Sequence, residues 1–137
     1  MNSKPAIITF QQKGKKAEGH ISIAHFAEDI PFEVKRAFWT YGTPDNILRG
    51  KHAHYETKQV MIAVCGQIEV KLRNARGKSL VFLLDSPDKG LFVPPNYWHT
   101  MKYSPDAVQL VLASTDFREE DYIRSPGRFL EYWGSDD

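Results

Sequence analysis

Cysteine is nearly absent from this sequence, and long apolar runs are missing altogether. Cys65 has no partner for a disulfide within the chain, so we expect a reducing compartment and a cytoplasmic protein. Because it follows the apolar run 60–64, we expect a buried thiol rather than a nucleophile. No stretch approaches the roughly 20 apolar residues that a membrane helix needs. Residues 1–16 resemble neither a signal peptide nor a transit peptide, which also fits a cytoplasmic location.

A large excess of charge is also missing, since 18 basic side chains stand against 17 acidic ones. Without a broad field of one sign, long nucleic acid is a poor candidate partner. Two glycine motifs for nucleotides are absent too. Segment 14–19 lacks the lysine and hydroxyl that complete a P-loop, so it is expected to be a solvated hairpin, and no Gly-x-Gly-x-x-Gly follows a strand. A small phosphorylated ligand still fits, because it needs only a few of the arginines.

Apolar alternation with period two is abundant, and it recurs from residue 7 to residue 114. Turn-forming Gly, Pro, Asn, Asp and Ser separate the alternating segments. The pattern predicts an all-β single domain over residues 1–137, built as a sandwich or jelly-roll barrel, with a short helix near the C-terminus. The longest loop is expected at 42–51. Strands are expected at 6–10, 20–26, 34–41, 59–65, 68–73, 80–84, 91–93, 99–103 and 108–114.

Three of the five histidines fall in two short segments. His52 and His54 are two residues apart, so both side chains leave the same face of an extended chain. His99 lies on a later strand, on the same face as Met101 and Tyr103, and is expected to point into the barrel. Imidazoles that titrate near neutral pH are suited to carrying protons, so this group is the candidate functional site.

The histidine segments resemble the two cupin motifs. Residues 50–66 contain His-x-His, four residues, Gln59, six residues and Gly, and residues 90–99 contain Pro-x-Asn-x-x-His, with Asn96 in a position that is usually Gly. The resemblance implies a single-barrel cupin. Metal-binding cupins carry glutamate at the position of Gln59, and an amide is a weaker ligand for a divalent cation. We therefore expect no metal and no other cofactor.

Longer strings resemble the sugar 3,4-ketoisomerases over residues 5–125, above all Arg49-Gly50-x-His52-Ala53-His54 and Asp121-Tyr122-Ile123-Arg124. The resemblance implies a dTDP-4-keto-6-deoxyglucose substrate and a homodimer that exchanges N-terminal strands, here residues 5–26. The remaining matching strings are Ile30-Pro31-Phe32, Lys35-Arg36, Asp85-Ser86-Pro87, Gly90-Leu91, Trp98-His99 and Val111-Leu112-Ala113-Ser114.

Moving a carbonyl between neighbouring sugar carbons is redox-neutral and needs only proton carriers. We predict His52 as the base and His54 as its partner, either in proton transfer or in binding a sugar oxygen, and the sequence does not separate the roles of the two histidines. For substrate binding we expect five further polar side chains: Arg36, Tyr41, Arg49, Gln59 and His99.

One strand departs from the resembling family. Phe38 and Trp39 stand where relatives often have two tyrosines, so Tyr41 would have to supply any phenol on that strand. Two alternatives stay open at this point. One is a nucleotide-sugar epimerase on the same barrel, and the other is a metal- or ligand-binding cupin without catalysis.

Overall fold

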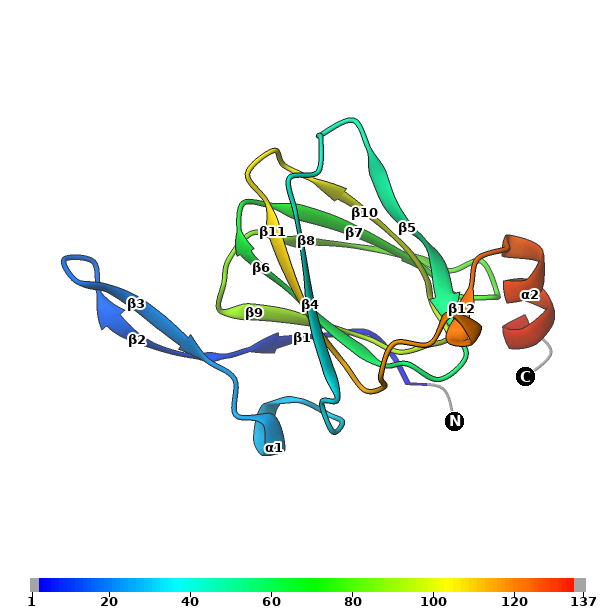
Figure 1. Cartoon of the computed structure of the whole chain (residues 1–137), viewed down its shortest axis with the longest axis horizontal. Helices are drawn as coiled ribbons and strands as arrows, with labels where there is room; N and C mark the ends of the chain where they lie inside the picture. Colours follow the sequence, from blue (N-terminus) through cyan, green and yellow to red (C-terminus); the bar gives the residue numbers. More distant parts are fainter. Residues whose placement is uncertain (1–2, 135–137) are drawn as a thin grey trace.

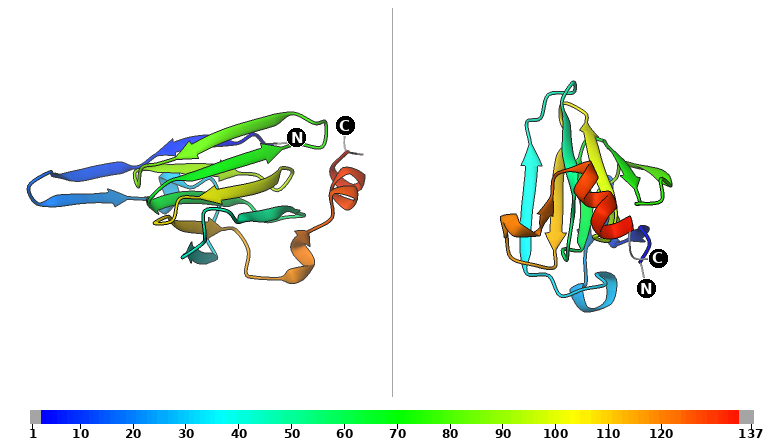
Figure 2. Two further views of the ribbon diagram at one scale, coloured as in Figure 1. Left: turned by 90° about the horizontal axis from the view of Figure 1, so that it is seen from above. Right: turned by 90° about the vertical axis from the view of Figure 1, so that its right-hand side faces the viewer.

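The computed structural model describes residues 3–134. Within this range two five-stranded antiparallel sheets pack face to face, ordered β1-β9-β6-β11-β4 and β12-β5-β10-β7-β8 (Figures 1 and 2). The all-β fold expected from the alternation is confirmed, as a two-layer sandwich rather than a closed barrel. The elements are β1 (Ala6–Thr9), β2 (Gln11–Lys15), β3 (Gly19–Ile23), α1 (Phe26–Asp29), β4 (Arg36–Tyr41), β5 (Leu48–His54), β6 (Gln59–Cys65), β7 (Ile68–Arg73), β8 (Ser79–Leu84), β9 (Lys89–Val93), β10 (Trp98–Tyr103), β11 (Val108–Ala113), β12 (Tyr122–Ile123) and α2 (Pro126–Gly134).

The core lies between the two sheets and follows the alternation of the sequence. On β7 the apolar residues Ile68, Val70 and Leu72 are buried, whereas Glu69 and Lys71 between them are exposed. The same parity buries His99, Met101 and Tyr103 on β10. Burial of these apolar side chains stabilises the sandwich, and the parity decides which polar side chains must also face inward.

The C-terminal helix predicted from the aromatic-rich tail is confirmed as α2. Its Phe129 is fully buried and packs near Trp98, at a ring distance of 5.8 Å. The Trp133 indole N–H donates a hydrogen bond to the backbone oxygen of His54. The helix therefore closes the end of the sandwich where β5 and β12 meet, directly behind the histidines.

Two local predictions were wrong. Leu48 already begins β5, so the loop predicted at 42–51 ends at residue 47. Cys65 is exposed, not buried, because the end of β6 runs past the core into the Gly66 turn and Val64 is exposed beside it. A register shift between Val108 and Gln109 on the neighbouring strand breaks the alternation at this point.

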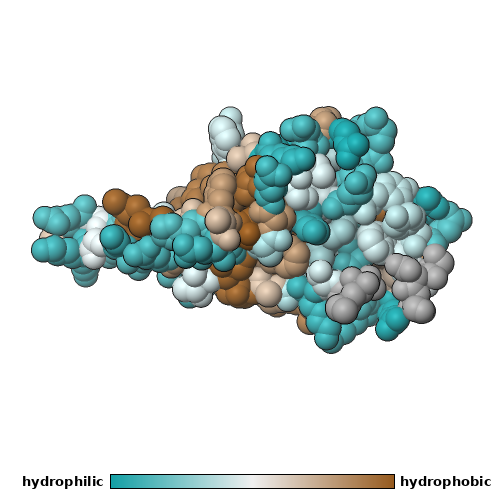
Figure 3. Space-filling view, turned by 90° about the horizontal axis from the view of Figure 1, so that it is seen from below, coloured by the Kyte–Doolittle hydropathy of each residue, from teal (hydrophilic) through white to brown (hydrophobic). Residues whose placement is uncertain are grey.

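A hairpin projects from the sandwich. β2 and β3 pair only with each other, and the predicted solvated turn at 14–19 is confirmed at their tip. The ribbon views show the hairpin extending away from both sheets (Figures 1 and 2). β1, by contrast, pairs with β9. Figure 3 shows apolar surface gathered near the base of the hairpin.

Across residues 3–134, the structure contains no helix with the length and apolar character needed to cross a membrane.

Candidate active site

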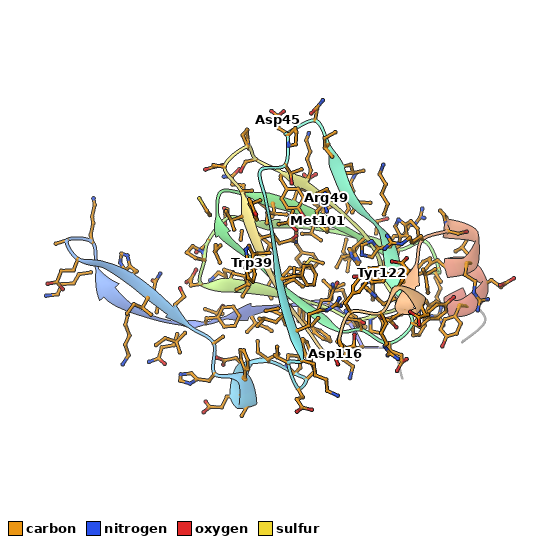
Figure 4. All side chains as sticks on the ribbon, in the orientation of Figure 1. Trp39, Asp45, Arg49, Met101, Asp116 and Tyr122 are labelled. Atoms are coloured by element: carbon orange, nitrogen blue, oxygen red, sulfur yellow. The ribbon has the colours of Figure 1, made fainter. Side chains whose placement is uncertain are left out.

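A cavity of about 240 Å³ opens between the two sheets. Four of the residues predicted for the site line it, namely Arg49, His52, Gln59 and His99. Figure 4 shows Arg49 near the middle of the body and Tyr122 toward the end where β12 lies. The other lining residues are Phe38, Thr40, Gly50, Met61, Met101, Tyr103, Gln109, Val111, Tyr122 and Arg124.

His52 is positioned by a bulge in β5. Gly50 has φ +87°, and a Cβ there would lie 2.8 Å from the carbonyl oxygen of His99, so only glycine fits. Lys51 follows with φ 63°, an unusual conformation for a residue with a side chain. The pairing of β5 with β10 shifts at this point, which places His52 opposite His99. The Arg-Gly-Lys segment thus sets the position of the imidazole.

The hydrogen bonds fix the tautomer of His52. Its Nδ1 lies 3.1 Å from the carbonyl oxygen of Gly50, which can only accept, so Nδ1 carries the proton. The Nε2 atom is therefore the basic one, and the N–H of His99 Nε2 donates to it across 3.1 Å. Burial, reinforced by neighbouring His54, lowers the pKa of His52 from 6.5 to about 4. At neutral pH His52 is an uncharged base at the cavity wall.

His54 lies behind the cavity instead of lining it. It is buried, and its ring lies 5.2 Å from that of His52. Its Nδ1 donates across 3.1 Å to Oδ2 of Asp121, so its lone pair is on Nε2. Burial alone would raise the pKa of Asp121, but hydrogen bonds from His54 and Thr57 outweigh it and lower this pKa to about 2. Asp121 is therefore an anion that holds His54 in one orientation.

Arg49 and Gln59 line the cavity, whereas Arg36 lies beside it. The guanidinium of Arg36 lies 5.2 Å from the ring centre of Phe38, and its buried Nε has no hydrogen-bond partner among the described residues. The buried Oε1 of Gln59 likewise has no partner in this part of the chain. An unpaired buried polar atom is costly, so both atoms are ready for a ligand.

Tyr41 does not reach the cavity. It is 68% exposed and lies on the outer face of β4 with Trp39, whereas Phe38 and Thr40 face inward. The pleat of the strand causes this, because Arg36 and Tyr41 are separated by an odd number of residues and cannot share a face. The structure therefore gives no support to Tyr41 as a site residue within its own subunit.

Several lining residues were not assigned a role from the sequence. Tyr103 donates a hydrogen bond of 2.6 Å to Oε1 of Gln109 on the cavity wall, and burial raises the pKa of Tyr103 to about 12. Tyr122 and Arg124 reach the cavity because β12 pairs with β5, with Tyr122 opposite His54. The only sequence signal for the last two was their place in the matching string Asp121-Tyr122-Ile123-Arg124.

The chain is similar to known proteins in sequence and in fold. The family model described as "FdtA: WxcM-like, C-terminal" matches residues 3–134. The chain belongs to the FdtA family. A curated relative, the TDP-4-oxo-6-deoxy-alpha-D-glucose-3,4-oxoisomerase of Aneurinibacillus thermoaerophilus, is 39% identical over 106 residues, which cover 77% of this chain and 76% of the relative.

Solved structures of 3,4-ketoisomerases are similar to this chain. A 3,4-ketoisomerase from Helicobacter canadensis has 34% identity and a TM-score of 0.89, covering 97% of this chain and 99% of that chain. A mutant of the 3,4-ketoisomerase QdtA from Thermoanaerobacterium thermosaccharolyticum, in complex with TDP-4-keto-6-deoxyglucose, has 29% identity and a TM-score of 0.92, covering 99% and 98%. The resemblance to sugar 3,4-ketoisomerases stated from the sequence is confirmed.

The three histidines are also placed as metal ligands would be. The ligand nitrogens of His52, His54 and His99 lie within 4.8 Å of one another and are close enough to surround a divalent cation. Imidazole nitrogens and the amide of Gln59 supply no negative charge as ligands, however, and His52 and His99 already bond to each other. The absence of a metal at this site therefore stays a prediction.

Metal independence is expected for this reason. After exhaustive treatment with a chelator, the turnover rate should stay within about twofold of that of the untreated protein, since no step needs a Lewis acid. Elemental analysis of the protein before treatment is the control. If activity disappears and a single divalent ion restores it, the histidines are metal ligands and the assignment fails.

The pH dependence of kcat/KM should reflect the neutral state of His52. With its pKa near 4, the base stays unprotonated at mildly acidic pH, so kcat/KM should remain level from pH 7 to about 5 and fall near 4. Because the folded pKa is below the unfolded 6.5, the stability that His52 contributes is full above pH 6.5 and is lost as the pH falls toward 4. Circular dichroism at each pH separates the two effects. An acid limb centred at pH 6.5 would contradict the assignment.

Proposed function

We propose that this protein interconverts TDP-4-keto-6-deoxy-D-glucose and its 3-keto isomer. The observation that carries the proposal is the uncharged His52, which lines a cavity of about 240 Å³ and has its lone pair on Nε2. The chain also belongs to a family that contains ketoisomerases. The named relatives act as 3,4-oxoisomerases or 3,4-ketoisomerases, and one binds TDP-4-keto-6-deoxyglucose. The product would serve the biosynthesis of a 3-amino deoxysugar.

The reaction begins at the sugar C3, whose proton is acidic because C4 is a ketone. His52 Nε2 removes this proton and leaves an enediolate spread over C3, C4 and the C4 oxygen. Delivery of a proton from His52 to C4, after exchange with solvent, and transfer of a proton from the C3 oxygen to the C4 oxygen complete the exchange of carbonyl and hydroxyl. No electrons enter or leave, so the residues of this chain suffice.

In the free protein, the basic nitrogen of His52 is occupied by the N–H of His99. A substrate C3–H must take that place, and the freed His99 N–H then has a sugar oxygen to bind. This gives His99 the substrate-binding role expected from the sequence. His54, held by Asp121 behind the cavity, keeps His52 in position and contributes no direct contact with the sugar.

The cavity has room for a sugar ring and not for a whole sugar nucleotide. Its volume of about 240 Å³ is below the roughly 300–1,000 Å³ of pockets for drug-sized ligands. The TDP moiety would therefore lie outside the ring site. Arg49 lines the cavity, and Arg36 has an unpaired buried Nε beside it. Guanidinium groups form two parallel hydrogen bonds to phosphate, so these arginines are the candidates for the diphosphate.

The sugar hydroxyls are expected to meet two amides on the cavity wall. Both Gln59 Oε1 and Gln109 Nε2 are buried without a partner among the described residues. A site with unpaired buried polar groups rejects analogues that lack the matching hydroxyl by a large factor, because the groups stay unpaired. The amides thus favour a polar sugar over an apolar ligand.

Incubation with TDP-4-keto-6-deoxy-D-glucose in deuterium oxide, followed by NMR, tests the proposal. The expected result is migration of the carbonyl from C4 to C3, with deuterium at C3 of recovered substrate and at C4 of the product. Retention of the C4 ketone with inversion at a neighbouring carbon would instead indicate the alternative epimerase. Absence of any change would indicate a cupin that binds without catalysis.

The assembly is expected to be a homodimer. A two-stranded hairpin is marginally stable alone in water, and the residues of β2 are all exposed in the single chain. Ile21 on β3 is 64% exposed, and the outer face of β4 exposes Trp39 and Tyr41. Twofold exchange of the hairpin would cover these surfaces at low cost.

A cytoplasmic location, inferred from the single cysteine, stays a prediction.

Removal of the hairpin tests the dimer. Gln11 and Ile23 are paired neighbours, so replacing residues 11–23 by two glycines keeps the sandwich connected. We expect sedimentation to show loss of the dimer and formation of monomer or aggregate. Changing only the turn, residues 16–18, to Asn-Gly is the matched control and should leave the dimer intact. A full-length protein that sediments as a monomer at micromolar concentration would refute the proposal.

A further inference from the structure

The exchange of carbonyl and hydroxyl needs two proton transfers, and His52 accounts for only one of them. The proton on carbon moves from C3 to C4 through the imidazole. A second proton must leave the C3 oxygen and reach the C4 oxygen. These oxygens are on adjacent carbons, so a single hydroxyl that can both donate and accept would serve both.

Among the described residues that line the cavity, Tyr103 and Tyr122 have phenols. Tyr103 is unsuited because it is four residues beyond His99 on β10, roughly 13 Å along the strand. Its O–H is also already donated to Oε1 of Gln109 across 2.6 Å. The Thr40 hydroxyl lines the cavity too, but an alcohol is a far weaker acid than a phenol.

Tyr122 is beside the base. Its ring centre lies 5.0 Å from that of His52 and 4.6 Å from that of His54. β12 pairs with β5 so that Tyr122 is opposite His54, while Ile123 is opposite Ala53 on the other face and is buried in a separate cluster. The ring therefore faces the histidines, and no hydrogen bond to its hydroxyl is found within residues 3–134.

A cation accompanies the phenol. The guanidinium carbon of Arg124 lies 4.5 Å from the centre of the Tyr122 ring. Both oxygens of Glu119 hold this guanidinium, at 2.7 and 3.1 Å, so its position is fixed. A guanidinium stacked on the ring favours the phenolate that forms when the hydroxyl gives up its proton, although the ion pair with Glu119 reduces its net charge.

We propose that Tyr122 is the catalytic residue that carries the proton between the two sugar oxygens, and this rests on the proposed ketoisomerase function. After His52 has taken the C3 proton and left the enediolate, the Tyr122 hydroxyl protonates the C4 oxygen and gives an enediol. The phenolate then removes the proton from the C3 oxygen, the C3 carbonyl forms, and C4 takes the proton from His52. Both side chains end in their starting states, and no oxidant or reductant is needed.

Tyr122→Phe tests this role because phenylalanine keeps the ring contacts with His52, His54 and Arg124. Two rates are measured in deuterium oxide: loss of the C3 proton from the substrate and appearance of the 3-keto isomer. We expect isomer formation to fall about a hundredfold or more, with C3 exchange within about tenfold of wild type, because His52 is intact. Tyr55→Phe removes a phenol bonded to Arg128 outside the cavity and should leave both rates within about twofold.

The other outcomes overturn the inference in distinguishable ways. If Tyr122→Phe loses both rates equally, Tyr122 only positions His52. If it loses neither, another group carries the oxygen proton. If the wild-type protein shows neither exchange nor isomerisation, the proposed function itself is refuted, and the inference falls with it. Calorimetric binding of TDP by each variant confirms that the compared proteins are folded and competent to bind.

Discussion

His52→Asn should lower kcat about a thousandfold and abolish exchange of the C3 proton. The asparagine amide N–H can keep the hydrogen bond to the Gly50 carbonyl, but it cannot supply the basic Nε2 lone pair. A positioned general base typically contributes about 10²–10⁴-fold, which sets the expected loss. The measurement is single-turnover kinetics with NMR detection of the label.

The loss should arise from chemistry and not from folding. His52 is half-buried at the cavity wall, so the free energy of unfolding should change by less than about 1 kcal/mol, as judged by denaturant titration. TDP binding should also be retained. His25→Asn is the matched control, because it removes an exposed imidazole that does not line the cavity. A His52→Asn protein with activity within tenfold of wild type would show that another group abstracts the proton.

The convergence of the histidines could be predicted because the β pleat fixes parity. His52 and His54 must leave the same face, and His99 shares a face with buried Met101 and Tyr103. The same rule would have excluded Tyr41 once Arg36 was assigned inward, since their separation is odd. The exposure of Cys65 was not predictable in this way, because a register shift opposite the end of β6 interrupts the alternation.

The partners of the histidines could not be predicted from local pattern. Asp121 is separated by 67 residues from His54, and the two meet only because the two-residue strand β12 adds to the edge of β5. So short a strand has no detectable periodicity. The bulge at Gly50 and Lys51, which aims His52 at His99, likewise depends on the close approach of β10. Long-range pairing thus completes a site whose histidines the sequence already indicates.

Asp121→Asn should damage both stability and activity. The carboxylate accepts from the backbone N–H of Glu56 at 2.8 Å, from the backbone and hydroxyl of Thr57, and from His54 Nδ1. An amide has one oxygen and one NH₂ group, so its NH₂ must face a donor that loses its acceptor. Leaving a buried donor unpaired costs about 1–3 kcal/mol, and more where charge is involved. We expect the free energy of unfolding to fall by about 3 kcal/mol.

The activity of the folded variant should fall about a hundredfold. Without the anion, His54 loses the acceptor that fixes its tautomer and orientation, and outer partners of functional histidines typically contribute about 10–100-fold. Asp116→Asn is the matched control, because Asp116 is exposed. It should leave both stability and kcat unchanged within error.

A double-mutant cycle with His54→Ala separates the two roles of Asp121. If the carboxylate acts through His54, the loss of kcat in the double variant should be smaller than the product of the two single losses. The stability that Asp121 contributes should also depend on pH, since its pKa is lowered from 3.8 to about 2 on folding. That contribution is present above pH 4 and disappears as the pH falls toward 2, so wild type and Asp121→Asn should converge in stability there. Multiplicative losses of kcat in the cycle would show that Asp121 supports the site without acting through His54.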